Sequence, residues 1–83
     1  MNRKKFLRRL LQSQTNARFA EVTGLAEALK FRLQRISGSH HIFLHSTCPA
    51  QLNLQEVNGQ AKPYQVRQLL KLIEQYDLRL VEE

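Results

Sequence analysis

The chain has 83 residues, one cysteine and a formal net charge of +6, from 13 lysines and arginines against 7 acidic residues. This length predicts one small domain with a modest hydrophobic core. A single cysteine excludes an intramolecular disulfide, and the apolar runs are too short to span a membrane. We therefore expect a cytoplasmic protein with no membrane partner.

The positive charge is concentrated at the N-terminus. Five basic residues lie within residues 3–9, and the first twenty residues contain no acid. Downstream of Gln12, eight basic residues face seven acidic ones, so the rest of the chain is almost neutral. A basic segment of this kind favours contact with a polyanion such as RNA, or with an acidic partner.

The N-terminal segment is predicted to form a short amphipathic helix over residues 2–12. Its basic residues lie opposite four apolar ones: Phe6, Leu7, Leu10 and Leu11. A polar stretch follows, so we expect residues 1–15 to be a basic helical extension. Residues 16–83 are expected to form the main domain.

The main domain is predicted to begin with a helix over residues 18–30. Its apolar residues recur at helical spacing: Val22, Leu25, Ala26 and Leu29. The period then changes to two, which predicts strands over residues 31–36, 40–46 and 51–57. Each strand is followed by residues that break it: Ser37-Gly38-Ser39, Thr47-Cys48-Pro49 and Asn58-Gly59.

A closing helix is predicted over residues 62–76, because Pro63 suits a first helical turn. Its core stripe is expected to be Val66, Leu69, Leu70 and Ile73. Residues 78–81 are expected to add a short strand or to pack as a tail. The order of elements predicts an α+β fold of the α-β-β-β-α type, like the double-stranded-RNA-binding domain. It has a three-stranded antiparallel sheet with two helices on one face, plus the extra basic N-terminal helix.

All three histidines lie in the second predicted strand: His40, His41 and His45. A metal site would need several of them, with Cys48, around one ion. In an extended strand His41 and His45 lie about 13 Å apart, at about 3.3 Å per residue, and no single ion bridges that distance. A Ser-His-acid triad is also disfavoured, because no nucleophile-elbow sequence surrounds Ser37 or Ser39. We therefore expect no metal and no other cofactor.

Acid–base chemistry on RNA is a further use for a histidine beside the Gly-Ser turn. RNA carries its own nucleophile, the 2′-OH, so an enzyme needs only a base, an acid and positive charge. Imidazole titrates near neutrality and serves either proton-transfer role, and arginine or lysine offsets charge on the phosphorane. The alternative is a histidine that only fills a strand position.

The stretch Arg35-Ile36-Ser37-Gly38-Ser39-His40-His41-Ile42-Phe43 resembles the signature R-x-x-G-S-H-x-x-F of HicA-type toxins, also called YcfA-like mRNA interferases. Residues 53–80 resemble the C-terminal half of a bacterial branch of that family. The similarity covers about residues 16 to 80, and the basic N-terminal helix is an extension to the shorter members.

The resemblance implies a double-stranded-RNA-binding-like fold and endoribonuclease activity on mRNA, as the toxin of a type II toxin–antitoxin system. It also implies a HicB-like antitoxin protein as partner. The catalytic histidine of the family maps onto His40, or onto His41 where one residue separates the serine from the histidine. RNA-binding residues are expected to be Arg32, Arg35, Ser39 and Lys62.

One departure concerns a V-P-x-H stretch that many family members carry after the third strand. Residues 54–58 of this chain contain neither proline nor histidine. Two functions are therefore retained: an active ribonuclease, and a non-catalytic module that binds RNA or a partner protein.

Strand parity also bears on which histidine is catalytic. Alternation puts His40, Ile42 and Leu44 on one face, and His41, Phe43 and His45 on the other. If Ile42 and Leu44 join the core, His40 lies at the edge of the covered face and His41 points to the open one.

Overall fold

The computed structural model describes residues 2–80, which form three helices and four strands. The elements are α1 (Arg3–Gln12), α2 (Phe19–Ala28), β1 (Arg32–Ser37), β2 (His40–His45), β3 (Cys48–Val57), β4 (Gln60–Ala61) and α3 (Pro63–Gln75). Each predicted helix and strand is confirmed, from the N-terminal helix to the closing helix. Residues 78–80 form no strand, and Val81, the end of the predicted tail, lies outside the described residues.

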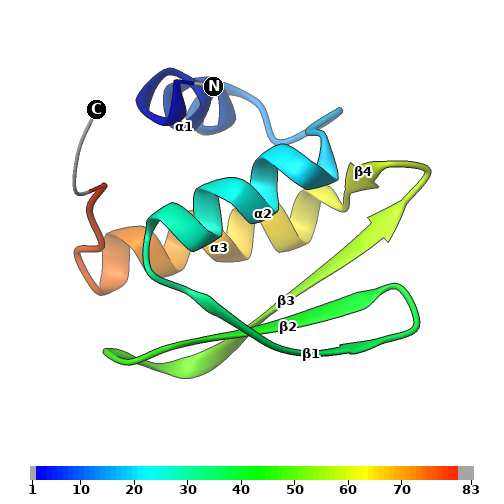
Figure 1. Cartoon of the computed structure of the whole chain (residues 1–83). Helices are drawn as coiled ribbons and strands as arrows, with labels where there is room; N and C mark the ends of the chain where they lie inside the picture. Colours follow the sequence, from blue (N-terminus) through cyan, green and yellow to red (C-terminus); the bar gives the residue numbers. More distant parts are fainter. Residues whose placement is uncertain (1, 81–83) are drawn as a thin grey trace.

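The domain is an α+β fold with an antiparallel sheet in the order β1-β2-β3-β4. Helices α2 and α3 cover one face of the sheet, and the other face is open (Figure 1). Helix α1 lies against α2, on the side of the helices away from the sheet (Figure 1). No helix between residues 2 and 80 has the length and apolar character needed to cross a bilayer.

The sequence predicted three strands and the structure has four, because the chain forms a second tight hairpin. Asn58 and Gly59 both have positive φ, 52° and 79°, as a two-residue type I′ turn requires. The turn brings Gln60–Ala61 back to pair with the end of β3. Two residues are too few to show a period, so the sequence predicted the turn but not the strand.

Strand β3 also begins earlier than predicted, at Cys48, and the turn before it occupies residues 46–47. Pro49 therefore lies inside a strand instead of breaking the chain. This is tolerated because β4 pairs only with Glu56 and Val57. The N-terminal half of β3 has β2 on one side alone, and proline is accepted in a strand that has a free edge.

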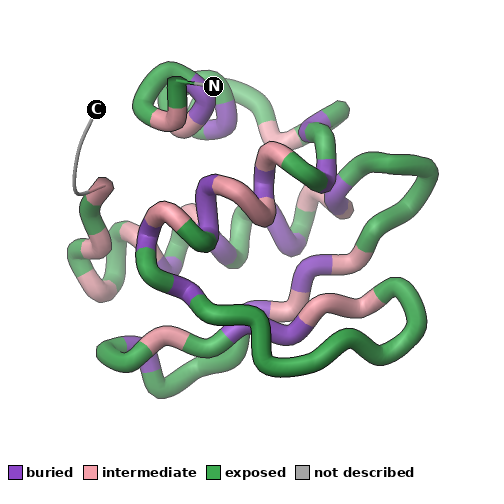
Figure 2. The backbone as a smooth tube through the Cα atoms, in the orientation of Figure 1, coloured by how far each residue is buried: buried purple, intermediate pink, exposed green. Residues whose placement is uncertain are grey.

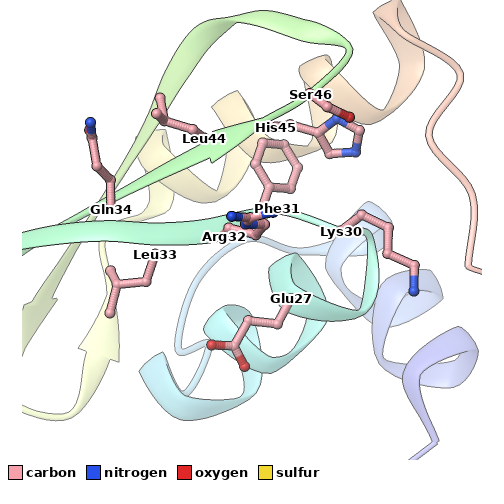
Figure 3. A pocket seen from close by; sticks show the side chains of 9 residues that line it. All are labelled: Glu27, Lys30, Phe31, Arg32, Leu33, Gln34, Leu44, His45 and Ser46. Carbon is pink, nitrogen blue, oxygen red and sulfur yellow. The ribbon is translucent and has the colours of Figure 1, made fainter.

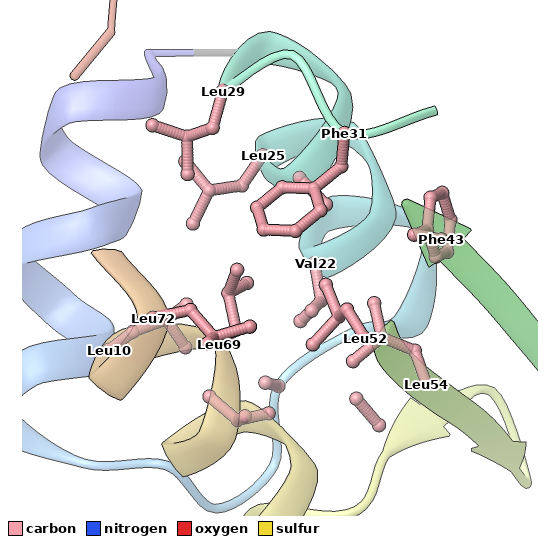
Figure 4. Packing of buried hydrophobic residues seen from close by; sticks show 14 of the residues in the cluster. Leu10, Val22, Leu25, Leu29, Phe31, Phe43, Leu52, Leu54, Leu69 and Leu72 are labelled. Carbon is pink, nitrogen blue, oxygen red and sulfur yellow. The ribbon is translucent and has the colours of Figure 1, made fainter. Parts of the chain in front are cut away.

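The hydrophobic core lies between the sheet and the helices (Figure 4). The predicted apolar positions of α2 are all buried there: Val22, Leu25, Ala26 and Leu29. In α3, Val66 and Leu69 are fully buried, whereas Leu70 and Ile73 are partly buried against the cluster. The sheet contributes three fully buried side chains: Phe43, Leu52 and Leu54.

Helix α1 belongs to the same core. Phe6 and Leu10 are buried in the cluster, and an Arg9–Glu21 ion pair of 3.4 Å connects α1 to α2. Leu11 was predicted on this apolar side, but it is 62% exposed. The apolar stripe that packs is therefore narrower than the sequence indicated, with Phe6 and Leu10 one helical turn apart at its centre.

Replacing Leu10 by alanine should test how firmly α1 is docked. Leu10 is 1% exposed, so Leu10→Ala should lower the free energy of unfolding by about 2–5 kcal/mol. The matched control Leu11→Ala removes the same atoms from an exposed site and should change it by less than about 0.5 kcal/mol. Urea unfolding followed by circular dichroism measures both, and equal losses would contradict the docking of α1.

Candidate active site on the open face of the sheet

The burial of Phe43 decides which side of β2 faces the helices. Phe43 is 1% exposed and pairs with Leu52, which lies in the same core. Ile42 is buried but lies outside the core cluster, and Leu44 is 37% exposed. The condition under which His40 would lie on the covered side, with Ile42 and Leu44 both in the core, is therefore not met. Alternation from Phe43 places His40 on the open face and the other two histidines on the covered face.

The His40 ring is held by a side chain of the neighbouring strand. Its Nδ1 lies 3.1 Å from Oδ1 of Asn53 on β3. An amide oxygen only accepts hydrogen bonds, so in the neutral ring Nδ1 carries the proton and Nε2 carries the lone pair. Within residues 2–80, Nε2 of His40 has no hydrogen-bond partner. The arrangement presents a basic nitrogen to the open face.

The turn before His40 is fixed to the rest of the sheet. Gly38 has φ of 61°, which suits the first central position of a type II′ hairpin turn. Ser39 accepts a hydrogen bond of 3.1 Å at its Oγ from Nε2 of Gln55. The backbone N–H of Gln55 in turn donates to Oε1 of the buried Gln65, on α3, at 2.6 Å. These bonds connect the Gly-Ser turn to β3, and β3 to α3.

His41 packs at the edge of the covered face. Its ring lies edge-on to Phe19 of α2, with centroids 4.7 Å apart. Its Nδ1 lies 3.4 Å from the carbonyl oxygen of Ser39. The structure therefore does not bring His41 together with His40, because the two rings lie on opposite faces of β2.

His45 connects the end of α2 to the turn between β2 and β3. Its Nε2 donates to the carbonyl oxygen of Leu29 at 2.9 Å, and its Nδ1 accepts from the backbone N–H of Thr47 at 3.1 Å. The ring also lies edge-on to Phe31, at 4.9 Å between centroids. With both ring nitrogens bonded, His45 is a structural residue.

No group of three or more histidine, cysteine or acidic side chains suited to a metal ion occurs within residues 2–80. His40 and His41 point to opposite faces, and His45 already uses both nitrogens. Cys48 is buried in the core, and this burial raises the pKa of its thiol. A thiol in that setting is a poor nucleophile near neutral pH, because the thiolate is the reactive form.

The basic residues predicted to contact phosphate lie in two different places on the domain. Arg32 and Arg35 pair with Leu44 and Ile42, so both arginines lie on the same open face as His40. Both are exposed. Lys62 is half-buried where β4 leads into α3, so β3 separates it from His40.

The basic residues of α1 lie away from this site. The helix is on the far side of α2 and α3 from the open face (Figure 1). Arg9 pairs with Glu21, and its guanidinium lies 5.1 Å from the centroid of the Phe6 ring. The expected contribution of α1 to RNA binding therefore does not come from the surface that carries His40.

Comparison of the chain with protein-family models, with curated proteins and with solved structures gave no match. Sequence reasoning missed two members of the site, Asn53 and Gln55. Both occupy the polar positions of an alternating strand, which was the signal that they face away from the core.

The stability of two alanine variants should separate a structural histidine from one that is free to act. His45→Ala removes the bond to Leu29, leaves the Thr47 N–H without its acceptor, and removes the contact with Phe31. It should lower the free energy of unfolding by about 2–3 kcal/mol. His40→Ala removes one bond on the open face and should cost less than about 1 kcal/mol. Urea unfolding measures both, and the reverse order would contradict these roles.

Proposed function

We propose that this chain is a HicA-type mRNA endoribonuclease with a double-stranded-RNA-binding-like fold, and that His40 is its catalytic residue. The single observation that carries the proposal is the state of the His40 ring. Its Nδ1 is held by Asn53, and its Nε2, on the open face, has no hydrogen-bond partner among residues 2–80. The helix, antiparallel strands and helix in sequence order, and the G-S-H turn, also support it.

In the proposed reaction, Nε2 of His40 takes the proton from the 2′-OH of a bound ribonucleotide. The 2′-oxygen attacks the adjacent phosphorus, and the bond from phosphorus to the 5′-oxygen breaks. The imidazolium then returns the proton to the departing 5′-oxygen. Arg35, on the neighbouring strand and the same face, would offset the charge on the phosphorane. Attack by a water would instead leave no cyclic phosphate, so the product ends distinguish the two nucleophiles.

Asn53 acts in this scheme as a positioning residue. By accepting from Nδ1 it fixes the ring orientation and the tautomer in which Nε2 is the base. His40 is the only histidine on the open face within residues 2–80, so it must serve as base and then as acid. A second histidine, as in many family members, would divide these tasks. A slower enzyme, or a module that binds without cutting, is the competing outcome.

The same proposal includes the partner that silences such toxins. A HicB-like antitoxin protein would keep the ribonuclease inactive in the cytoplasm, and mRNA would be the substrate. Neither partner follows from the fold alone, and both depend on the resemblance around residues 35–43.

Cleavage by histidine variants tests the proposed role of His40 directly. His40→Ala should lower the rate of RNA cleavage by about 10²–10⁴-fold, the usual contribution of a general acid–base group. His41→Ala is the matched control, because His41 lies on the other face and should leave the rate nearly unchanged. The readouts are growth arrest and mRNA decay on induction, and cleavage of purified RNA.

Asn53→Ala extends the same experiment. The imidazole is kept and only its orientation is released, so kcat should fall while KM is retained. Full cleavage by His40→Ala would overturn the mechanism. If the wild type binds RNA but does not cut it, the result would favour the alternative function, a non-catalytic binding module.

The salt dependence of RNA binding should identify which cations touch phosphate. Replacing Arg32 and Arg35 by glutamine should flatten the slope of log K against log salt by about 1.4, at about 0.7 per phosphate contact on single-stranded RNA. Lys4→Gln with Lys5→Gln removes equal charge from the exposed surface of α1 and should leave the slope unchanged. A larger effect from the α1 pair would place RNA on the opposite side of the molecule.

A further inference from the structure

The outer edges of β1 and β4 differ in their pairing, and the first half of β3, beyond the end of β4, has a free edge of its own. The outer edge of β4 is closed by the segment before α2: Phe19 N–H donates to the Gly59 carbonyl, and Ala61 N–H donates to the Ala17 carbonyl, both at 2.9 Å. Arg18 and Gln60 form a β-bridge at the same place. The outer edge of β1 is paired with nothing in the described chain. The residues of β1 whose N–H and C=O groups point away from β2 therefore offer unpaired backbone groups to another strand.

Strand β1 is exposed along its whole length (Figure 2). Leu33 and Ile36 are 44% and 56% exposed, although they pair with Phe43 and His41, whose side chains face the helices. The helix layer does not extend over β1. Beside the strand lies a hollow of about 820 Å³, lined by Leu33, by Glu27 at the end of α2 and by Lys30 in the turn that follows the helix (Figure 3). The apolar side of β1 is therefore left uncovered.

A β-bulge in β1 places the arginine side chains and the aliphatic side chains of this strand on opposite faces of the sheet. Leu33 pairs with Phe43 and Arg35 pairs with Ile42, so Gln34 is an extra residue without a partner. In a regular strand, residues three apart point to opposite faces. The bulge instead places Arg32 and Arg35 together on the open face, and both aliphatic side chains on the helix side.

The charges on β1 indicate what kind of strand fits this edge. Lys30, Arg32 and Arg35 are basic, and β1 contains no acid. A second copy of the chain, paired edge to edge, would bring two sets of arginines together on one face, and like charges on neighbouring strands are destabilising. An acidic strand would instead complement them.

We propose that the outer edge of β1 binds an extended acidic segment of a partner protein by β-strand addition. Main-chain hydrogen bonds would extend the sheet, apolar side chains of the segment would cover Leu33 and Ile36, and its acidic side chains would face Arg32 and Arg35. The proposal uses no property of His40 and does not depend on the ribonuclease activity.

Amide hydrogen exchange of the full-length protein tests this proposal. The probe is a blocked octapeptide that alternates valine with glutamate, and its control alternates valine with lysine. At saturation the acidic peptide should slow exchange of the residue 32–37 amides that point away from β2 by roughly tenfold or more, because those amides become hydrogen-bonded. The lysine peptide should leave exchange unchanged.

Two variants locate the binding surface. Leu33→Lys combined with Ile36→Lys should abolish protection by the acidic peptide, and the exposure of both side chains favours a folded variant, which circular dichroism checks. Val57→Lys alters an exposed apolar strand residue elsewhere and should retain protection. Equal loss in both variants, equal binding of the lysine peptide, or no acidic-peptide binding would overturn the proposal.

Two other occupants are separate outcomes of the same measurement. Protection of β1 that grows with protein concentration, without peptide, would assign the edge to a second copy. Protection by a uridine oligonucleotide and not by the acidic peptide would assign it to RNA. Either result would overturn the proposed partner segment.

Discussion

The burial of Phe43 is the constraint on which the rest of the site depends. A strand has only two faces, and a side chain as large as phenylalanine at the centre of a small core leaves no freedom in choosing between them. Once Phe43 points to the helices, His41 and His45 must follow it. Both then contact aromatic side chains on the covered side, whereas His40 lies on the open face, although all three histidines are half-buried. The chemistry proposed for this protein thus follows from the placement of an apolar neighbour.

The surroundings of His40 are held by polar contacts that run across the fold. Asn53 holds the ring, Gln55 holds the turn, and Gln65 holds the strand that carries both. Gln65 is the one buried polar residue within residues 2–80, and its bond to a backbone N–H satisfies a group that a two-residue β4 cannot reach. The buried side-chain amide of Gln65 thus provides the hydrogen bond that a longer β4 would otherwise make to β3.

Most of the fold could be predicted from the sequence, because local periods and turn residues specify the helices and strands. The differences occur where tertiary contacts decide. The position of Leu11 outside the core depends on the angle at which α1 crosses α2. Strand β4 depends on a turn that aligns two residues with β3, and the early start of β3 depends on its free edge beside Pro49.

The site was less accessible to prediction than the fold. The sequence indicated His40 as a candidate, together with Arg32 and Arg35 on a neighbouring strand. It did not indicate Asn53, because the contact between positions 40 and 53 exists only in one register of β2 against β3. The sequence also did not determine which face of β2 the helices cover, since Ile42 and Phe43 are both apolar and either could have filled the core.

The bulge at Gln34 decides which side chains of β1 share a face. In a regular strand the same six residues would alternate strictly, so Arg35 would join Leu33 on the helix side and Ile36 would join Arg32 on the open face. Because Gln34 is the extra residue, its deletion would give a regular strand in which Leu33 still pairs with Phe43 and Arg35 with Ile42. The arginines and the aliphatic side chains would therefore stay on separate faces after that deletion, as they would after most substitutions at Gln34. The separation requires only that Arg35 and Ile36 keep their partners on β2.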